Sequence, residues 1–421
     1  MRRSLRLPAA LLAAVVVAQT AVIIMSPRDA GPDPASVSSR EYFTPREIAR
    51  AQDYRSPQLV LYGVTMAIEL AVLIGLTRRA GRRPTSPGAR RGRLATVARR
   101  PVPAGAAGGA AISLALTLAT LPVSAVSRQR AIDVGLSTRS WSGWAQDVLL
   151  GAVIGAALAA AGGAVLVVVL RRFGRTWWAP GAAAVLAFAV VTTYLTPVVI
   201  EPLFNRFTPL PPGRTRTEIL DLARRAGVRV GQVYVVDASK RTTGANAYVA
   251  GLGATKRIVL YDTLLRDFPP AEVRLVVAHE LGHVHHSDVP HGLLWVAIVA
   301  PFGMLAVARL AERLGPEDWH ARPAATVPAV ALALALVVPA VTMISNQLSR
   351  RVEARADFFS LQLTQDPRTL IAFQRRIARA NVSDPDPPGL ASFLLSTHPQ
   401  TLERIGAATA FEQRGSVEPG Q

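Results

Sequence analysis

The sequence His279-Glu280-Leu281-Gly282-His283 places two histidines four residues apart, with a glutamate beside the first. On an α-helix, residues four positions apart lie on one face, so both imidazoles can point at the same metal ion. The glutamate then reaches a water molecule at that ion and can act as a general base. An apolar run, Leu275–Ala278, leads into the motif, as is typical of a buried helix. These residues predict a zinc site with one ion per chain.

An apolar stretch begins nine residues after the motif, at Gly292. The hydrocarbon core of a bilayer is about 30 Å thick, so a helix needs about 20 apolar residues to cross it. Seven stretches meet or approach that length: Leu7–Met25, Leu59–Thr77, Ala104–Val126, Val148–Leu170, Trp178–Ile200, Gly292–Leu310 and Val327–Ile344. The third and fourth are rich in alanine and glycine, which suits close helix packing in lipid. The sequence therefore predicts a mainly α-helical polytopic membrane protein with about seven transmembrane helices.

Composition narrows the possible functions. Half of the 421 residues are hydrophobic, and the chain contains no cysteine, which excludes disulfides, thiolate metal ligands and a cysteine nucleophile. The formal net charge of +19 comes almost entirely from arginine, because Lys240 and Lys256 are the only lysines. Most arginines flank apolar stretches, where they anchor helices at lipid headgroups. The expected partners are therefore the lipid bilayer and a peptide or membrane-protein substrate, and no nucleic acid.

Two features of the apolar stretches allow alternative interpretations. Leu7–Met25 follows two arginines and could be a secretory signal, but its apolar run exceeds the usual 7–15 residues, so we expect a retained span. Glu69 lies inside the second stretch, where a carboxylate is energetically costly. It either bonds to another helix, which is the simpler interpretation, or lines a water-filled chamber.

The polar region between the fifth and sixth apolar stretches is predicted to be a soluble insert. It contains a helical pattern at Thr217–Ala226, an extended run at Gln232–Val236, and two runs, Asn246–Tyr248 and Arg257–Tyr261, joined by a glycine-containing turn. Pro270 and Glu272 mark the start of the helix that carries the metal motif. The predicted division is 1–200 for five spans, 201–291 for the catalytic insert, 292–346 for two spans and 347–421 for C-terminal catalytic helices and tail. The insert is expected to be a small α+β zincin-like metalloprotease domain.

A third metal ligand must come from elsewhere, because catalytic zinc normally has three protein ligands and one open position. The best candidate is Glu353, on a predicted helix over Ser349–Leu363. Two antiparallel spans separate it from His283, which returns the chain to the same membrane side. Asp357 lies one helical turn further and is placed to hydrogen-bond a ligating histidine.

The remaining histidines are weaker candidates. His285, His286 and His291 follow the motif without the spacing of a third ligand, so we interpret them as polar surface or interfacial residues. His398, in Thr397-His398-Pro399, is either a turn residue or a donor to the oxyanion that forms during peptide hydrolysis.

Several segments together resemble one family, the type I CAAX prenyl proteases, which are seven-span membrane zinc metalloproteases. The similar segments are Pro202–Leu210, Ser239–Arg241, Asn246–Tyr248, Arg257–Leu265, His279–His283, Leu348–Asp357 and His398–Arg404. The resemblance implies that His279, His283 and Glu353 bind zinc and that Glu280 is the base. It also implies that Asp357 supports a ligand, that His398 contacts the substrate or its oxyanion, and that Arg404 is a nearby charge partner.

The resemblance further implies that the hairpin residues Asn246, Ala247 and Tyr248 pair with an extended peptide. Two regions depart from the family pattern. Only Arg266–Pro270 stands where eukaryotic members carry a longer insert before the metal helix, and the region between the third and fourth spans is only loosely similar. Both departures affect substrate selection rather than hydrolysis.

The orientation in the membrane is ambiguous from sequence. Nine arginines and no acidic residue occur between Arg78 and Arg100, which marks this loop as cytoplasmic and, by alternation, places the catalytic insert outside. The family resemblance implies the opposite, and we expect a cytoplasmic catalytic side on that basis. The arginine-rich, cysteine-free composition fits a bacterial cell membrane, where a prenylated substrate is unexpected.

The sequence thus predicts a membrane-integral zinc metalloendopeptidase. One alternative is a peptide-binding protein on the same fold that has lost catalysis, although Glu280 argues against it. A second is an intramembrane-cleaving zinc protease, but the motif precedes an apolar span and is flanked by Glu272, Arg274 and Asp288. A third, a transporter, rests only on the number of spans.

Overall fold

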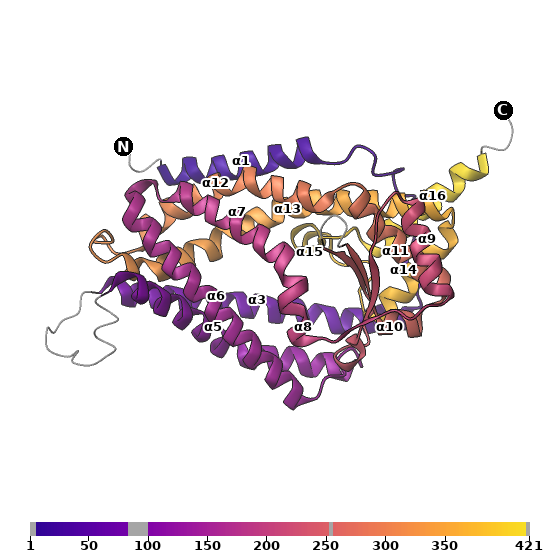
Figure 1. Ribbon diagram of the computed structural model, residues 1–421, viewed down its shortest axis with the longest axis horizontal. Helices are drawn as coiled ribbons and strands as arrows, with labels where there is room; N and C mark the ends of the chain where they lie inside the picture. The colour runs from indigo at the N-terminus through magenta and orange to yellow at the C-terminus, as the bar shows by residue number, and fades with distance from the viewer. Residues whose placement is uncertain (1–5, 83–99, 252–255, 418–421) are drawn as a thin grey trace.

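Seven long apolar helices form the larger part of the protein (Figure 1). The computed structural model describes residues 6–82, 100–251 and 256–417. The candidate spans are α1 (Arg6–Met25), α3 (Pro45–Gly81), α5 (Pro101–Asp133), α6 with η1 (Trp141–Thr176), α7 to α8 (Trp178–Phe204), α12 (Asp288–Leu314) and η5 with α13 (Pro323–Thr364). Each overlaps one predicted apolar stretch. The predicted fold class, a seven-span helical membrane protein with a small α+β domain, is confirmed.

The outer faces of these helices are apolar and exposed. Leu12, Val60, Leu118 and Leu149 each leave 65–69% of their surface uncovered. In water such a continuous apolar surface would drive aggregation, whereas in a bilayer lipid chains cover it. Glu69, in α3, is partly buried.

Small residues bring α5 and α6 into close contact, as predicted from their composition. A Cβ atom added to Gly109 would lie 2.0 Å from the backbone oxygen of Ala159, and one added to Gly163 would lie 2.2 Å from that of Gly105. No side chain fits at such distances, so glycine is required there. In lipid, where water drives no association between apolar faces, this backbone proximity maximises van der Waals contact.

The soluble domain lies at one end of the helix bundle, on the right in Figure 1. Its four-stranded sheet has the order β1-β2-β4-β3, with β1 at Phe207–Pro209, β2 at Gln232–Val236, β4 at Arg257–Tyr261 and β3 at Ala247–Ala250. Strand β4 runs parallel to β2 and antiparallel to β3. The predicted pairing of the two extended runs is therefore confirmed, and β3 forms an edge of the sheet. Gly251 begins the turn with a φ of 98°, and residues 252–255 of that turn lie outside the described residues.

Helices pack around this sheet. They are α9 (Arg214–Arg225), α10 (Asp262–Asp267), α11 (Pro270–His285), α14 (Pro367–Ala380), α15 (Gly389–Leu395) and α16 (Thr401–Val417), with short α2 (Ser39–Tyr42) and η3 (Ala238–Lys240) nearby. The hydrophobic core of the domain includes Ile219 of α9, Ile258 of β4, Leu275 of α11 and Leu370 of α14, each 2% exposed or less. Helix α11 therefore sits between the sheet and α14, which fixes the position of the metal motif.

Helix α13 is longer than the sequence analysis expected. The seventh span and the predicted helix Ser349–Leu363 form one continuous α-helix, Val327–Thr364, so the division placed between residues 346 and 347 falls inside it. At the C-terminal end, α16 extends from Thr401 through Val417. A single continuous helix thus extends from the membrane into the soluble domain and carries Glu353 there.

Candidate active site

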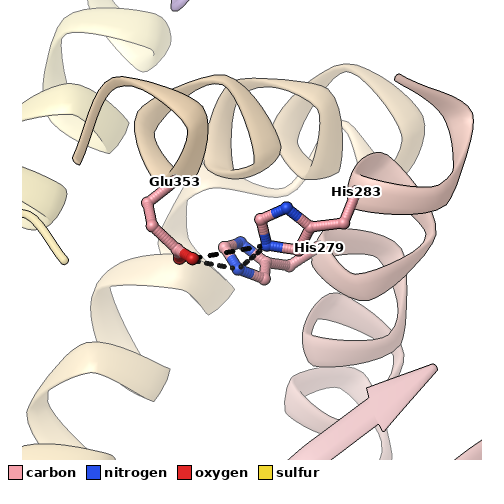
Figure 2. A group of neighbouring side chains, drawn as sticks. All are labelled: His279, His283 and Glu353. Atoms are coloured by element: carbon pink, nitrogen blue, oxygen red, sulfur yellow. Dashed lines mark hydrogen bonds and ion pairs between the residues drawn. The ribbon is translucent and has the colours of Figure 1, made fainter. Parts of the chain in front are cut away.

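Two helices supply the three candidate metal ligands. His279 and His283 lie one turn apart on α11, and Glu353 lies on α13, which crosses α11 at this point (Figure 2). Gly282, between the two histidines, allows the crossing: a Cβ atom there would lie 3.2 Å from the ring of Phe359 and 3.3 Å from the Cα of Ala356. Because Gly282 has no side chain, α11 can approach α13 closely at this point.

The ligand atoms have the spacing of a tetrahedral metal site. The Nε2 atoms of His279 and His283 are 3.2 Å apart, and each lies 3.2–3.5 Å from a carboxylate oxygen of Glu353. Zinc bonds of 2.0–2.1 Å in a tetrahedral arrangement separate neighbouring ligand atoms by about 3.3 Å. All three ligand atoms lie within 4.8 Å of one another. The spacing therefore fits one metal ion.

Hydrogen bonds to the far side of each imidazole orient the two histidines. The Nδ1 atom of His279 lies 2.9 Å from Asp357, and that of His283 lies 2.8 Å from Asp288. A carboxylate only accepts hydrogen bonds, so each Nδ1 carries a proton and each Nε2 faces Glu353. Two imidazole nitrogens and a carboxylate oxygen converge at one point, an arrangement that suits a cation.

The electrostatics of the cluster also favour a cation. Burial alone would lower the pKa of His279, but the carboxylates of Asp357 and Glu353 outweigh burial and raise the pKa to about 10. One oxygen of Glu353, Oε2, is buried and accepts no hydrogen bond from the described residues. A metal ion would satisfy that oxygen, so the residues fit the group that the motif implies.

An arginine completes the support of His279. Arg404, on α16, donates two hydrogen bonds of 2.6 and 2.7 Å to the carboxylate of Asp357. The side chain of Asp357 is 4% exposed and that of Arg404 is 15% exposed, so water screens this pair little. The family resemblance implied a charge partner at Arg404, and its contact is with Asp357.

Asp288 is a site residue that the sequence analysis treated only as a charge flanking the motif. It is the first residue of α12, and its carboxylate contacts both His283 and Arg355 of α13. The backbone reverses at Ser287, whose φ of 57° is left-handed, and this reversal returns Asp288 to the metal motif. Pro290, in the first turn of α12, marked a helix start here and could have indicated that the chain turns at this point.

Glu280 points into a cavity of about 350 Å³ beside the metal cluster. Burial raises the pKa of Glu280, and the neighbouring His279 and His283 oppose that effect. A carboxylate with a raised pKa is a better proton acceptor near neutral pH than an ordinary glutamate.

The same cavity is lined by His398, whose Nε2 lies 3.3 Å from Glu353. Burial lowers the pKa of His398; the charge of Glu353 opposes this effect and the charge of Arg404 adds to it.

The three hairpin residues lie in different positions. Asn246 lines the cavity, and its side-chain oxygen accepts a hydrogen bond from the backbone N–H of Ala247. Ala247 begins the edge strand β3, whereas the hydroxyl of Tyr248 donates to Glu201. Edge strand and cavity are therefore adjacent at Asn246.

The three other histidines after the motif lie outside the metal cluster. His285 contacts the backbone oxygen of Ala226, its ring packs beside those of His286 and Phe359, and His291 contacts the backbone oxygen of Ser287. Their surroundings agree with the interpretation of these residues as polar or interfacial.

Comparisons with known proteins agree with this architecture. Residues 209–412 match peptidase family M48, and residues 34–206 match the family of CAAX prenyl protease N-terminal regions with five membrane helices. The chain is 31% identical over 307 residues to "Uncharacterized metalloprotease YhfN" of Bacillus subtilis, covering 72% of each chain. It is 34% identical over 240 residues to "CAAX prenyl protease 1 homolog" of Arabidopsis thaliana, spanning 55% of the length of that protein.

A solved structure shares the fold over nearly the whole chain. The crystal structure of S. mikatae Ste24p matches with a TM-score of 0.68 and 19% sequence identity, covering 97% of this chain and 99% of that chain. Both the helix bundle and the soluble domain are therefore part of a known architecture.

Proposed function

Because the chain belongs to peptidase family M48, we propose that it is a membrane-integral zinc endopeptidase that cleaves peptide bonds in the cavity beside Glu280. The observation that carries this proposal is the convergence of the ligand atoms of His279, His283 and Glu353 at one point next to that cavity. A bound zinc ion would polarise the peptide carbonyl and make water more acidic.

The residues around the ion have separate roles. Glu280 takes a proton from the attacking water and passes it to the leaving amine. His398, partly exposed at the cavity, donates a hydrogen bond to the oxygen that becomes negative as water attacks. Asp357 and Arg404 hold His279 in place without touching the reacting atoms, and Asp288 does the same for His283.

The edge strand β3 is the proposed docking site for the substrate backbone. In its antiparallel pairing with β4, the carbonyl of Asn246 accepts from Tyr261, and hydrogen-bonded pairs alternate along the strand. The carbonyl of Ala247 and the N–H and carbonyl of Val249 therefore point toward the open edge. An extended peptide can pair with these groups and enter the cavity at Asn246.

The proposed substrates are peptides or membrane proteins of a bacterial cell membrane. The curated plant relatives are named as CAAX prenyl proteases, but this chain spans only about half of their length. With the short segment Arg266–Pro270 before α11, this chain also differs from them where substrate selection is expected to lie. General processing of peptides or membrane proteins is therefore favoured over prenyl-protein cleavage.

The decisive experiment compares the purified wild type with Glu280→Gln in detergent, measuring zinc content and cleavage of a quenched fluorescent peptide library. Zinc in both proteins with cleavage by the wild type alone supports the proposal. Equal cleavage by both would refute the role of Glu280. Zinc without cleavage in either would favour the alternative, a silent peptide-binding protein. Glu312→Gln, at the opposite end of the bundle, is the matched control.

A further inference from the structure

One wall of the active-site cavity is the end of α14, which the proposed chemistry does not use. Asn381, the residue that caps α14, and Ser383 line the cavity together with Glu280 and His398. Both Asn381 and Ser383 are partly exposed. Within the described part of the chain, the side-chain carboxamide of Asn381 makes no hydrogen bond. A polar group next to the catalytic glutamate is therefore available to a molecule that enters the cavity.

The side chain of Asn381 lies beside the segment that leads into the edge strand β3. A Cβ atom added to Gly244 would lie 3.0 Å from Oδ1 of Asn381. Two residues further along the chain, Asn246 lines the cavity, and β3 begins at Ala247. The carboxamide is thus close to the point at which a peptide docked on β3 would enter. Because a carboxamide both donates and accepts, it matches the N–H and C=O groups of a peptide backbone.

The backbone directly after Asn381 is strained. Val382 has a φ of 46°, in the left-handed region that β-branched residues rarely adopt. The N–H of Val382 donates to Arg379 and that of Ser383 donates to Ala378, which are the two bonds of a Schellman C-cap. Glycine is the usual residue at the position of Val382 in this motif. Such strain persists only where surrounding contacts outweigh it, and it is concentrated at functional sites.

Arg55 of the membrane helix α3 supplies these contacts. Its Nε donates to the carbonyl of Val382 over 2.8 Å, and its Nη2 donates to the carbonyl of Asn381 over 2.7 Å. A longer bond of 3.4 Å joins Nη2 to the hydroxyl of Ser383. Hydrogen bonds from a charged donor are stronger than those between neutral groups. A guanidinium on a membrane helix therefore holds the backbone of Asn381 in place.

The segment that leads into β3 is held by the same part of the helix bundle. The hydroxyl of Thr242 donates over 3.0 Å to the backbone of Leu136, in the connection between α5 and α6. Helix α5 is in turn bonded to α3, because Arg130 donates over 2.6 Å to the backbone of Asp53. The ends of α3 and α5 thus position Asn381 and the start of β3 relative to each other.

We propose that Asn381 binds a backbone peptide group of the substrate where the substrate enters the cavity, and that Arg55 is a positioning residue that holds Asn381 for this contact. The inference rests on the proposed peptidase function and adds a substrate-binding residue outside the metal motif. Every peptide presents the same backbone groups, so this contact contributes to the binding of peptides that differ in their side chains.

The first test measures binding to the Glu280→Gln protein, which holds a peptide without the proposed general base. Fluorescence anisotropy with a fluorescein-labelled peptide from the library gives the Kd. Adding Asn381→Ala should raise the Kd about tenfold, because hydrogen bonds to the peptide are lost, and should leave zinc content unchanged. In the cleaving protein, Asn381→Ala should raise KM and leave kcat unchanged. An unchanged Kd and KM would overturn the inference.

The second test identifies the backbone group. A series of the same peptide carries one N-methyl group each, which removes a single backbone N–H. At one position, methylation should weaken binding to Glu280→Gln about tenfold and have no effect once Asn381→Ala is added. Losses that both proteins share report on pairing with β3 instead. If the loss depends on Asn381 at no position, the contact with the backbone is refuted.

The third test concerns Arg55. Arg55→Met should raise the Kd, and combining it with Asn381→Ala should cause no further rise, because Arg55 acts through Asn381. Arg379→Met is the matched control, since it breaks the exposed ion pair with Glu47 that also joins α14 to α3, and it should leave the Kd unchanged. Additive rises in Kd would overturn the positioning role. If Arg55→Met loses zinc, Arg55→Lys, which keeps the charge but not the planar fork, takes its place.

These measurements separate the inference from the proposed function. Absence of cleavage by the wild type, with the expected changes in Kd, would overturn only the peptidase function. Cleavage by the wild type, with the same Kd and KM in Asn381→Ala, would overturn only the role of Asn381.

Discussion

The Nδ1 atom of His283 lies 2.8 Å from Oδ2 of Asp288, the first residue of membrane helix α12. Arg355 of α13 donates a hydrogen bond to the same carboxylate. The second histidine of the motif is therefore oriented by residues at the ends of two membrane spans. The membrane bundle thus helps to position the metal site and is more than an anchor for the soluble domain.

Replacing Asp288 by asparagine should weaken metal binding. The amide keeps the shape of the side chain but removes the charge that fixes the tautomer of His283, and such outer partners typically contribute 10–100-fold in metal affinity. Competition with a fluorescent zinc chelator measures the change. Asp267→Asn, at an exposed surface pair with Arg266, should bind zinc as the wild type does. Unchanged affinity in Asp288→Asn would refute the positioning role.

Replacing Arg404 by methionine should lower both stability and activity. The change leaves the buried carboxylate of Asp357 without its guanidinium partner, and breaking a buried pair in this way costs about 3–5 kcal/mol. We expect a clearly lower Tm of the detergent-solubilised protein. Arg414→Met, on the exposed part of the same helix, is the matched control and should leave Tm unchanged. A small effect of both substitutions would show that the Asp357 pair contributes little.

Enlarging Gly282 to valine should push α11 away from α13. The added side chain would meet Phe359 and the backbone at Ala356, so Glu353 would move away from the two histidines. Zinc content and cleavage should both fall. Gly292→Val offers a comparison, because a Cβ atom at Gly292 meets nothing within 4 Å. Full zinc content in Gly282→Val would contradict the view that helix proximity sets the ligand spacing.

Removing the metal should destabilise the protein, because the ion links α11 to α13 and binds only the folded state. Titration with a chelator should lower the Tm of the wild type and abolish cleavage, and added zinc should restore both. Glu353→Ala should show a low Tm that the chelator does not change further. His286→Ala should behave like the wild type, since His286 lies outside the metal cluster.

Much of this arrangement was predictable from the sequence because its signals are local. Span length, the four-residue spacing of His279 and His283, and the extended runs at Gln232–Val236 and Arg257–Tyr261 each follow from one stretch of chain. The candidate ligand Glu353 required only that two spans return the chain to the same side.

The remainder depended on tertiary contacts that leave no local signal. The break at Ser287 has a left-handed backbone without glycine, so the contact between Asp288 and His283 could not be read from residue type. The continuity of α13 was also missed, because its change from apolar to polar residues resembles a boundary although the helix runs through it.

The zinc site is tested most directly by anomalous diffraction at the zinc absorption edge from crystals of the purified protein. We expect one peak per chain, about 2 Å from the Nε2 atoms of His279 and His283 and from a carboxylate oxygen of Glu353. The peak should be absent in Glu353→Ala crystals and present in Glu280→Gln crystals. A wild-type protein without a peak, or with its peak away from these three residues, would refute the zinc site at His279, His283 and Glu353.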